Sequence, residues 1–120
     1  MAVVRDFREI KVWGKGHQLT LMIYQVTKTF PRDELYGLVS QMRRSSTSIP
    51  TNIAEGCGKG SDAELARFMQ ISMGSASELE YQLLLAKDLG YLQPDDHQKL
   101  HRAIVEIKMM LGPFIKKLRG

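Results

Sequence analysis

An apolar repeat in the last quarter of the chain constrains the fold most strongly. It recurs at alternating spacings of three and four residues, through His97, Leu100, Ile104, Ile107, Leu111, Phe114 and Leu118. This spacing places all seven side chains on one face of a single helix. Pro94 suits the first turn of that helix, and Asp95 and Asp96 follow it near the positive end of the helix dipole. Pro113 predicts a kink or a frayed last turn.

The preceding segment carries a second apolar stripe of the same kind. It runs through Leu65, Phe68, Met69, Ser72, Ala76, Leu79, Leu83 and Ala86. Ser61 and Glu64 form a capping box at its start, because the serine can accept from a helix amide while the glutamate reaches back. Gly90 suits its end. The pattern therefore predicts a long third helix.

Two further helices are expected before residue 61. Residues 17–30 form the first, and Pro31 ends it because proline cannot continue the hydrogen-bond ladder. The second starts at about Leu35, with Asp33 as its cap, and continues through Pro50. Its end is predicted at the glycines Gly56, Gly58 and Gly60. The apolar positions of these two helices are Leu19, Met22, Ile23, Val26, Phe30, Leu35, Leu38, Val39, Met42, Ile49 and Ile53.

Four helices with short connections predict an all-α fold, an antiparallel up-down-up-down four-helix bundle. The 120 residues are expected to form a single domain, 1–120, with 1–12 as an extended N-terminal arm. Phe7, Ile10 and Trp13 are expected to pack on the bundle. The chain has one cysteine, no apolar signal-peptide core and no apolar stretch long enough to span a membrane, so a cytoplasmic protein is expected.

Apolar residues outside the main stripes predict an oligomer. A monomeric bundle needs one apolar stripe per helix, and wider faces indicate a second contact. The alternative is that these residues simply widen the core. They are Ile71, Met73, Leu84 and Leu85 in the third helix and Val105, Met109, Met110 and Ile115 in the fourth.

The charge of the chain is basic and unevenly distributed. Lysine and arginine number 17 against 13 acidic residues. Residues 97–120 hold six of the basic residues and only Glu106 as an acid, whereas residues 68–96 hold five acids and only Lys87 as a base. A polyanion could bind the basic segment, or the two segments could face one another.

Recognised catalytic and ligand-binding patterns are not met. Gly58-Lys59-Gly60-Ser61 breaks the phosphate-loop pattern and follows a helix instead of a strand. Cys57 is expected to be a small buried residue, and the hydroxyls of residues 45–48 to bond back to the helix. His97 and His101, four residues apart, form only a weak metal signal. No enzyme, no cofactor and no metal site are therefore expected.

Arg43 and Arg44 remain open to two interpretations. They are adjacent on the second helix, so their side chains point roughly 100° apart. They could pair with Glu78 or Glu80 on a neighbouring helix or subunit, or they could contact phosphates.

Several motifs resemble one bacterial family. They are E-x-Y-G-L at 34–38, Q-x-R-R at 41–44, S-I-P-x-N-I-A-E-G at 48–56 and G-S-x-S-E-L-E at 74–80. The chain resembles the four-helix bundle proteins named after the 23S rRNA intervening sequence, also called S23 ribosomal proteins. This resemblance implies a ring-like homopentamer without enzymatic activity. A related bundle, the accessory protein of diversity-generating retroelements, binds nucleic acid and reverse transcriptase.

We therefore expect a homo-oligomer that binds RNA, or DNA, through basic patches without reading sequence. The alternative is an interaction scaffold for a protein partner with no nucleic-acid role. The candidate nucleic-acid-binding residues are Arg43, Arg44, Lys59, Arg67, Arg102, Lys108, Lys116 and Lys117.

Overall fold

The computed structural model describes residues 5–120 and shows only helical elements in them. The predicted all-α fold is therefore confirmed. Two short 3₁₀ helices precede the first and second long helices. The elements are η1 (Phe7–Glu9), α1 (Lys11–Thr27), η2 (Arg32–Glu34), α2 (Leu38–Cys57), α3 (Asp62–Asp88) and α4 (Pro94–Arg119).

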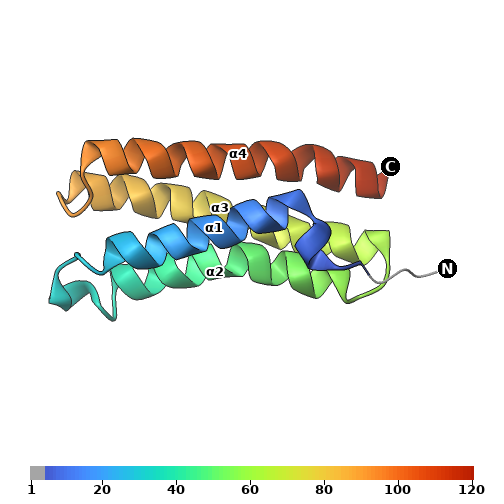
Figure 1. Cartoon of the computed structure of the whole chain (residues 1–120), viewed down its shortest axis with the longest axis horizontal. Helices are drawn as coiled ribbons and strands as arrows, with labels where there is room; N and C mark the ends of the chain where they lie inside the picture. The colour runs from blue at the N-terminus through green and yellow to red at the C-terminus, as the bar shows by residue number, and fades with distance from the viewer. Residues whose placement is uncertain (1–4) are drawn as a thin grey trace.

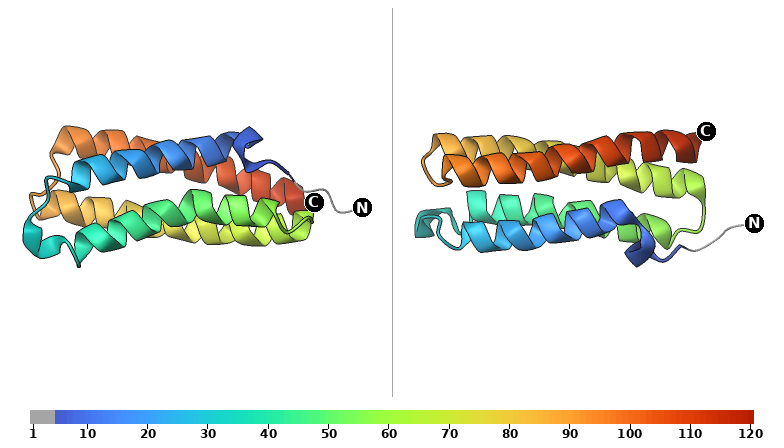
Figure 2. Two further views of the ribbon diagram at one scale, coloured as in Figure 1. Left: turned by 60° about the horizontal axis from the view of Figure 1, so that its bottom comes forward. Right: turned by 45° about the horizontal axis from the view of Figure 1, so that its top comes forward.

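The four long helices run alternately up and down (Figure 1). Each packs against the next along the chain, and α4 closes the bundle against α1, so α2 and α4 are diagonally opposite and their backbones do not approach each other closely. The bundle measures 50 × 23 × 19 Å. The N-terminal end of the described chain and the C-terminus of α4 lie at the same end of the bundle (Figure 2). The outward faces of α2 and α4 consequently lie on opposite sides of the bundle.

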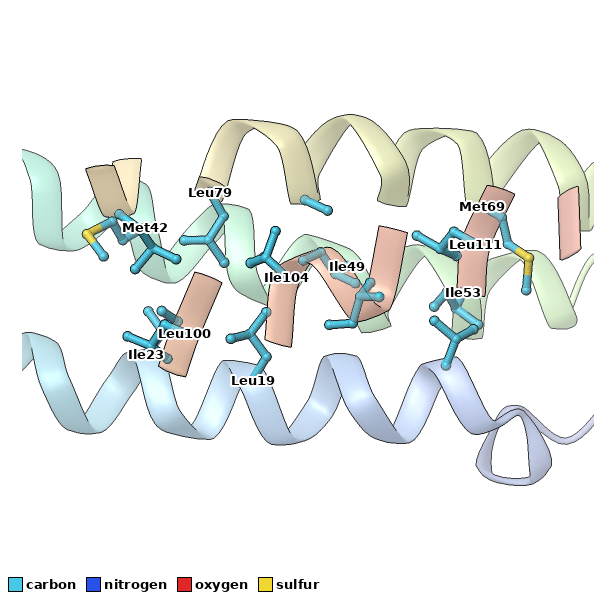
Figure 3. Close-up of a cluster of buried hydrophobic side chains, with 14 of the residues drawn as sticks. Leu19, Ile23, Met42, Ile49, Ile53, Met69, Leu79, Leu100, Ile104 and Leu111 are labelled. Atoms are coloured by element: carbon cyan, nitrogen blue, oxygen red, sulfur yellow. The ribbon is translucent and has the colours of Figure 1, made fainter. Parts of the chain in front are cut away.

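The core consists of the apolar stripes found in the sequence (Figure 3). Leucine, isoleucine and methionine side chains from all four helices meet along the bundle axis. Burial of each such side chain stabilises the fold by roughly 1.5–3 kcal/mol relative to an exposed one. The central residues, all at most 2% exposed, include Leu19, Ile23, Met42, Ile49, Ile53, Met69, Leu79, Leu100, Ile104 and Leu111.

The start of the chain differs from the predicted extended arm over 1–12. Residues 7–9 form a 3₁₀ helix and α1 already begins at Lys11, while residues 1–4 lie outside the described part. The helix thus begins six residues before the predicted start at residue 17, and it includes Gly16, which is buried: a Cβ there would lie 3.0 Å from Cγ2 of Ile49. Glycine is thus needed for close packing of α1 on α2, and not as a helix breaker. Phe7, Ile10 and Trp13 do pack on the bundle.

The start of α2 also differs from the prediction. Its N-cap residue is Gly37 and not Asp33, and the Glu34 carboxylate accepts from the first helical amide, that of Leu38, at 3.1 Å. Leu35 therefore lies before the helix and is exposed, outside the apolar seam. From Leu38 the helix continues through Pro50 to Cys57, as predicted.

Both prolines inside helices are tolerated. In α4 the helix continues for six residues beyond Pro113, so the predicted fraying of the last turn is wrong. The Met109 carbonyl, which Pro113 leaves without its usual donor, belongs to an exposed residue, so water can reach it. No helix in the described residues is both long and apolar enough to cross a membrane.

Candidate nucleic-acid interface

The eight basic residues singled out in the sequence do not form one patch. Arg43 and Arg44 lie on α2, Lys59 lies in the α2–α3 connection and Arg67 lies on α3. The other four are on α4, which is diagonally opposite α2. A single ligand on one face therefore cannot contact all of them. They also differ in whether the chain itself already neutralises their charge.

Arg43 is largely occupied by contacts within the chain. Its Nε donates to the Thr27 hydroxyl at 3.0 Å, and Nη2 lies 3.5 Å from the Tyr24 carbonyl oxygen. The guanidinium also stacks 4.7 Å from the centroid of the Tyr24 ring. These contacts come from α1, 16 to 19 positions earlier in the chain, so the sequence pattern could not show them. Neither Glu78 nor Glu80 pairs with this arginine within the chain.

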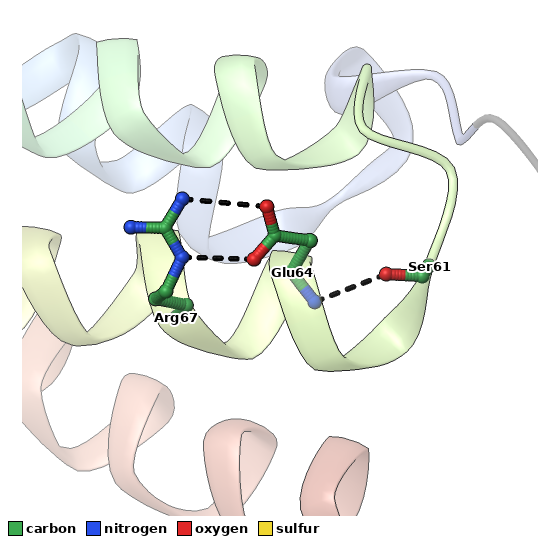
Figure 4. A network of polar contacts seen from close by, with 3 residues as sticks. All are labelled: Ser61, Glu64 and Arg67. Carbon is green, nitrogen blue, oxygen red and sulfur yellow. Dashed lines mark hydrogen bonds and ion pairs between the residues drawn. The ribbon is translucent and has the colours of Figure 1, made fainter.

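Arg67 is paired with a carboxylate on its own helix. It donates to both oxygens of Glu64, at 2.8 and 3.3 Å, while the Ser61 hydroxyl accepts from the Glu64 amide (Figure 4). The hydrogen bond from Arg67 lowers the pKa of Glu64 and raises that of the arginine. The predicted Ser61 cap is confirmed. The Glu64 carboxylate, however, accepts from Arg67 instead of from the backbone amide of Ser61, as a capping box would require. Arg67 is thus a poor candidate for free phosphate contact.

Lys108 is likewise neutralised. Its Nζ lies 2.9 Å from Oε1 of Glu80 across the α3–α4 contact, and Nδ1 of His101 lies 3.8 Å from the other oxygen. The acidic segment and the basic segment therefore do face each other at this point. Part of the charge asymmetry in the sequence is internal complementarity.

Six candidates have no ion pair among residues 5–120: Arg43, Arg44, Lys59, Arg102, Lys116 and Lys117. Lys59 lies over the Phe68 ring at 5.5 Å. Arg43 is partly buried, and the other five are exposed. Three of the six are on α4, more than on any other helix.

The outward face of α4 also holds a basic residue that the candidate set missed. Lys99, Arg102, Glu106, Met109, Pro113 and Lys116 recur every three or four residues and are all exposed. Their spacing matches that of the core seam, on the opposite face, and this was the signal that could have revealed Lys99. Glu106, the acid on this face, is paired with Lys15 at 3.1 Å. We call Lys99, Arg102, Lys116 and Lys117 the α4 stripe; it extends about 25 Å at 1.5 Å per residue.

His97 and His101 stack on each other, with ring centroids 5.8 Å apart. Burial lowers the pKa of His97, and the positive charges of Lys87 and His101 act in the same direction. No group of three histidine, cysteine or acidic residues in the described chain is arranged to hold a metal ion.

Ser46, Thr47 and Cys57, in the middle and at the end of α2, have structural roles. The hydroxyls of Ser46 and Thr47 donate to the Arg43 carbonyl at 3.0 and 2.7 Å, as expected for hydroxyls that bond back to a helix. Cys57 is buried, and this burial raises the pKa of its thiol. A raised pKa keeps the thiol protonated and unreactive, so nothing in this segment resembles an activated nucleophile.

Comparisons with known proteins agree with this arrangement. The chain is similar over 88% of its length to a crystal structure of a protein of unknown function from the S23 ribosomal protein family of Bacteroides thetaiotaomicron VPI-5482. The two share 26% sequence identity with a TM-score of 0.80, and the match covers 95% of the other chain. A search among curated proteins found no match. The 23S rRNA-intervening sequence protein family matches residues 8–113, and the chain therefore belongs to this family.

Proposed function

We propose that this protein is a non-enzymatic cytoplasmic homo-oligomer, a pentamer, that binds RNA through the α4 stripe without reading base sequence. The observation that carries the proposal is the exposed, unneutralised charge of Lys99, Arg102, Lys116 and Lys117 along one helix. Lysine and arginine side chains bind phosphates by displacing counterions. Several copies of a weak stripe around one assembly would bind a long polyanion together.

The proposal predicts a steep salt dependence. Four phosphate contacts per copy would weaken binding about a hundredfold between about 50 and 200 mM salt. Fluorescence anisotropy with a structured RNA, and with a DNA duplex of the same length, measures this. Absence of binding at about 50 mM salt, or binding that salt does not weaken, would contradict the proposal.

A matched pair of variants tests the location. Arg102→Glu with Lys116→Glu reverses two charges of the α4 stripe. Lys11→Glu with Lys28→Glu reverses two exposed charges elsewhere, at the first residue of α1 and at the residue that follows its end. Both double variants change the net charge equally. We expect the first to lose RNA binding at least tenfold more than the second. Equal losses would show that only overall charge matters.

Exposed apolar and aromatic residues also support a protein–protein contact, which the scaffold alternative requires. Tyr36, Tyr81 and Met109 are 93%, 61% and 71% exposed. We assign most of this surface to contacts between copies of the chain. Light scattering tests the assembly, since a stable species of 13.6 kDa would contradict it.

A further inference from the structure

Six of the nine large apolar residues that are exposed among residues 5–120 fall into two groups, one around α2 and one on α3. One group, which includes Tyr24, Leu35 and Tyr36, surrounds the start of α2. The other lies on α3 and includes Ile71, Tyr81 and Leu84. A symmetric dimer needs only one self-complementary surface, whereas a head-to-tail contact needs two different ones. The chain presents two.

The first surface is concave. A groove of about 690 Å³ runs along α2 and is bordered by Tyr24, Tyr36 and Arg44. Much of its remaining lining is short and polar, including Thr47, Thr51 and Asn52. Short side chains leave a hollow along a helix into which another element can enter. We call this surface the α2 groove.

The second surface is a stripe of exposed residues along α3, which we call the α3 ridge: Ile71, Gly74, Glu78, Tyr81 and Leu84. Gly74 lies in the middle of the helix, and a Cβ there would meet nothing within 4 Å. Glycine inside a helix is destabilising relative to alanine, and nothing in the chain requires it at this position. The absence of a Cβ at this exposed position would allow another backbone to approach α3 closely.

Charge is complementary between the two surfaces. Arg44 borders the α2 groove and has no ion pair among residues 5–120, and Glu78 on the α3 ridge has none either. Arg43 is held beside the groove by Thr27 and Tyr24, so its position is set before any partner arrives. Preorganised cationic side chains lower the entropic cost of association.

We propose that the α3 ridge of one copy packs into the α2 groove of the next. This inference rests on the proposed assembly and names the surfaces that form it. Because α2 and α3 are adjacent helices, the two surfaces face different directions, so each copy is rotated relative to the one before it. A ring forms where this rotation closes after a whole number of copies. Arg43 and Arg44 then belong to the subunit contact, and the α4 stripe, across the bundle from α2, stays open for RNA.

Two variants with opposite defects test the pairing. Tyr36→Glu places a charge in the α2 groove, and Tyr81→Glu places one on the α3 ridge. Both residues are exposed, so each variant is expected to keep the helical circular dichroism of the wild type. Each alone should shift the mass measured by light scattering to that of a monomer. An equimolar mixture should form a species of twice the monomer mass and no larger, because one intact groove and one intact ridge remain. Met109→Glu, an exposed apolar residue outside both surfaces, should keep the wild-type mass.

A third variant separates assembly from folding. Gly74→Leu fills the space that a neighbour would need but introduces a better helix former. It should therefore lose the oligomer. Its midpoint of urea unfolding, measured at a concentration where all variants are monomers, should not fall below that of the wild type. Loss of both assembly and stability would instead indicate a role inside the bundle, contrary to the inference.

Other outcomes overturn the proposal in distinguishable ways. If the wild type is an oligomer whose mass neither tyrosine variant changes, or if the mixed variants remain monomers, the pairing is wrong while the proposed assembly stands. If Tyr36→Glu keeps the wild-type mass but weakens RNA binding, the α2 groove is an RNA site instead. A monomeric wild type contradicts both the pairing and the assembly.

Discussion

The Thr20 hydroxyl of α1 lies 2.9 Å from the Ser46 carbonyl oxygen of α2. Ser46 precedes Pro50 by four residues, so its carbonyl is the one that Pro50, lacking an amide proton, leaves without a helical donor. The same hydroxyl also lies 2.9 Å from the Gly16 carbonyl oxygen. A neighbouring helix thus satisfies the backbone group that the proline frees, and α2 can continue to Cys57.

Removal of this hydroxyl should destabilise the protein. We expect Thr20→Val to cost about 1–3 kcal/mol of unfolding free energy, because the carbonyl of the buried Ser46 loses its donor. In a Pro50→Ala background the restored amide can serve Ser46, so the same change should cost less. Urea unfolding of the four proteins of this double-mutant cycle measures the coupling. Equal costs in both backgrounds would mean that the hydroxyl does not compensate for the proline.

Thr29→Val provides the control for that cycle. Its hydroxyl also bonds to a helix carbonyl, that of Val26 at 2.9 Å, but the residue is exposed. Water can replace the lost donor there, so we expect a change within about 0.5 kcal/mol.

Two glycine substitutions should change stability in opposite directions. A Cβ at Gly56 would lie 2.9 Å from Cβ of Phe68 and 3.2 Å from Cα of Leu65. Neither atom is at the end of a flexible chain, so Gly56→Ala should cost about 1–3 kcal/mol. At Gly14 in α1 a Cβ would meet nothing within 4 Å, so Gly14→Ala should gain up to about 1 kcal/mol through helix propensity. Thermal unfolding at one protein concentration checks both signs, and a stabilising Gly56→Ala would refute the close contact of α2 with α3.

The Ser61 cap should be measurable on its own. The Ser61 hydroxyl oxygen accepts from the Glu64 amide at 3.2 Å and satisfies one of the free donors at the start of α3. Ser61→Ala should therefore lower the unfolding free energy by about 1 kcal/mol. Ser77→Ala, at an exposed position inside the same helix, should not lower it, because alanine is the better helix former there. Similar losses for both serines would show that capping is unimportant at this end.

His97 should make stability depend on pH in the acid range. Its pKa is lowered in the folded state by burial and by Lys87 and His101, with Asp88 acting in the opposite direction. The unfolded chain therefore takes up the proton at a higher pH than the folded chain, and stability is lost as pH falls below the unfolded value of about 6.5. His97→Gln should reduce this loss. The difference in urea midpoint between pH 7.5 and a pH of about 5 measures it, and His17→Gln serves as the exposed control.

An NMR titration of the native protein tests the direction independently. The ring protons of His97 should shift with a midpoint below that of the unfolded chain. A midpoint at or above the ordinary histidine value would contradict the explanation by burial.

The local rules of helix formation were readable without any structure. The three- and four-residue spacings of Leu100 to Leu118 and Leu65 to Ala86 predicted α4 and α3, because periodicity and capping depend only on residues close along the chain. Ser61 and Pro94 marked the helix starts for the same reason. Such rules failed at Gly16, where an unfavourable helix residue is required by the approach of Ile49 from another helix.

Local rules could not predict which basic side chains remain without an ion pair. Lys108 and Arg102 looked equivalent in the sequence, yet Glu80, 28 positions away from Lys108, neutralises the lysine and leaves the arginine exposed. Arg43 and Arg44 are adjacent, and only the first is held by α1.

The sequence by itself determined the helical class, the four helices and their apolar seams, since these follow from the order of residues within each segment. The tertiary structure alone decided which basic residues remain available, which group donates to the Ser46 carbonyl that Pro50 leaves free, and where the α2 groove lies. Those features join residues from different helices, and their energies depend on distances that exist only once the helices have packed.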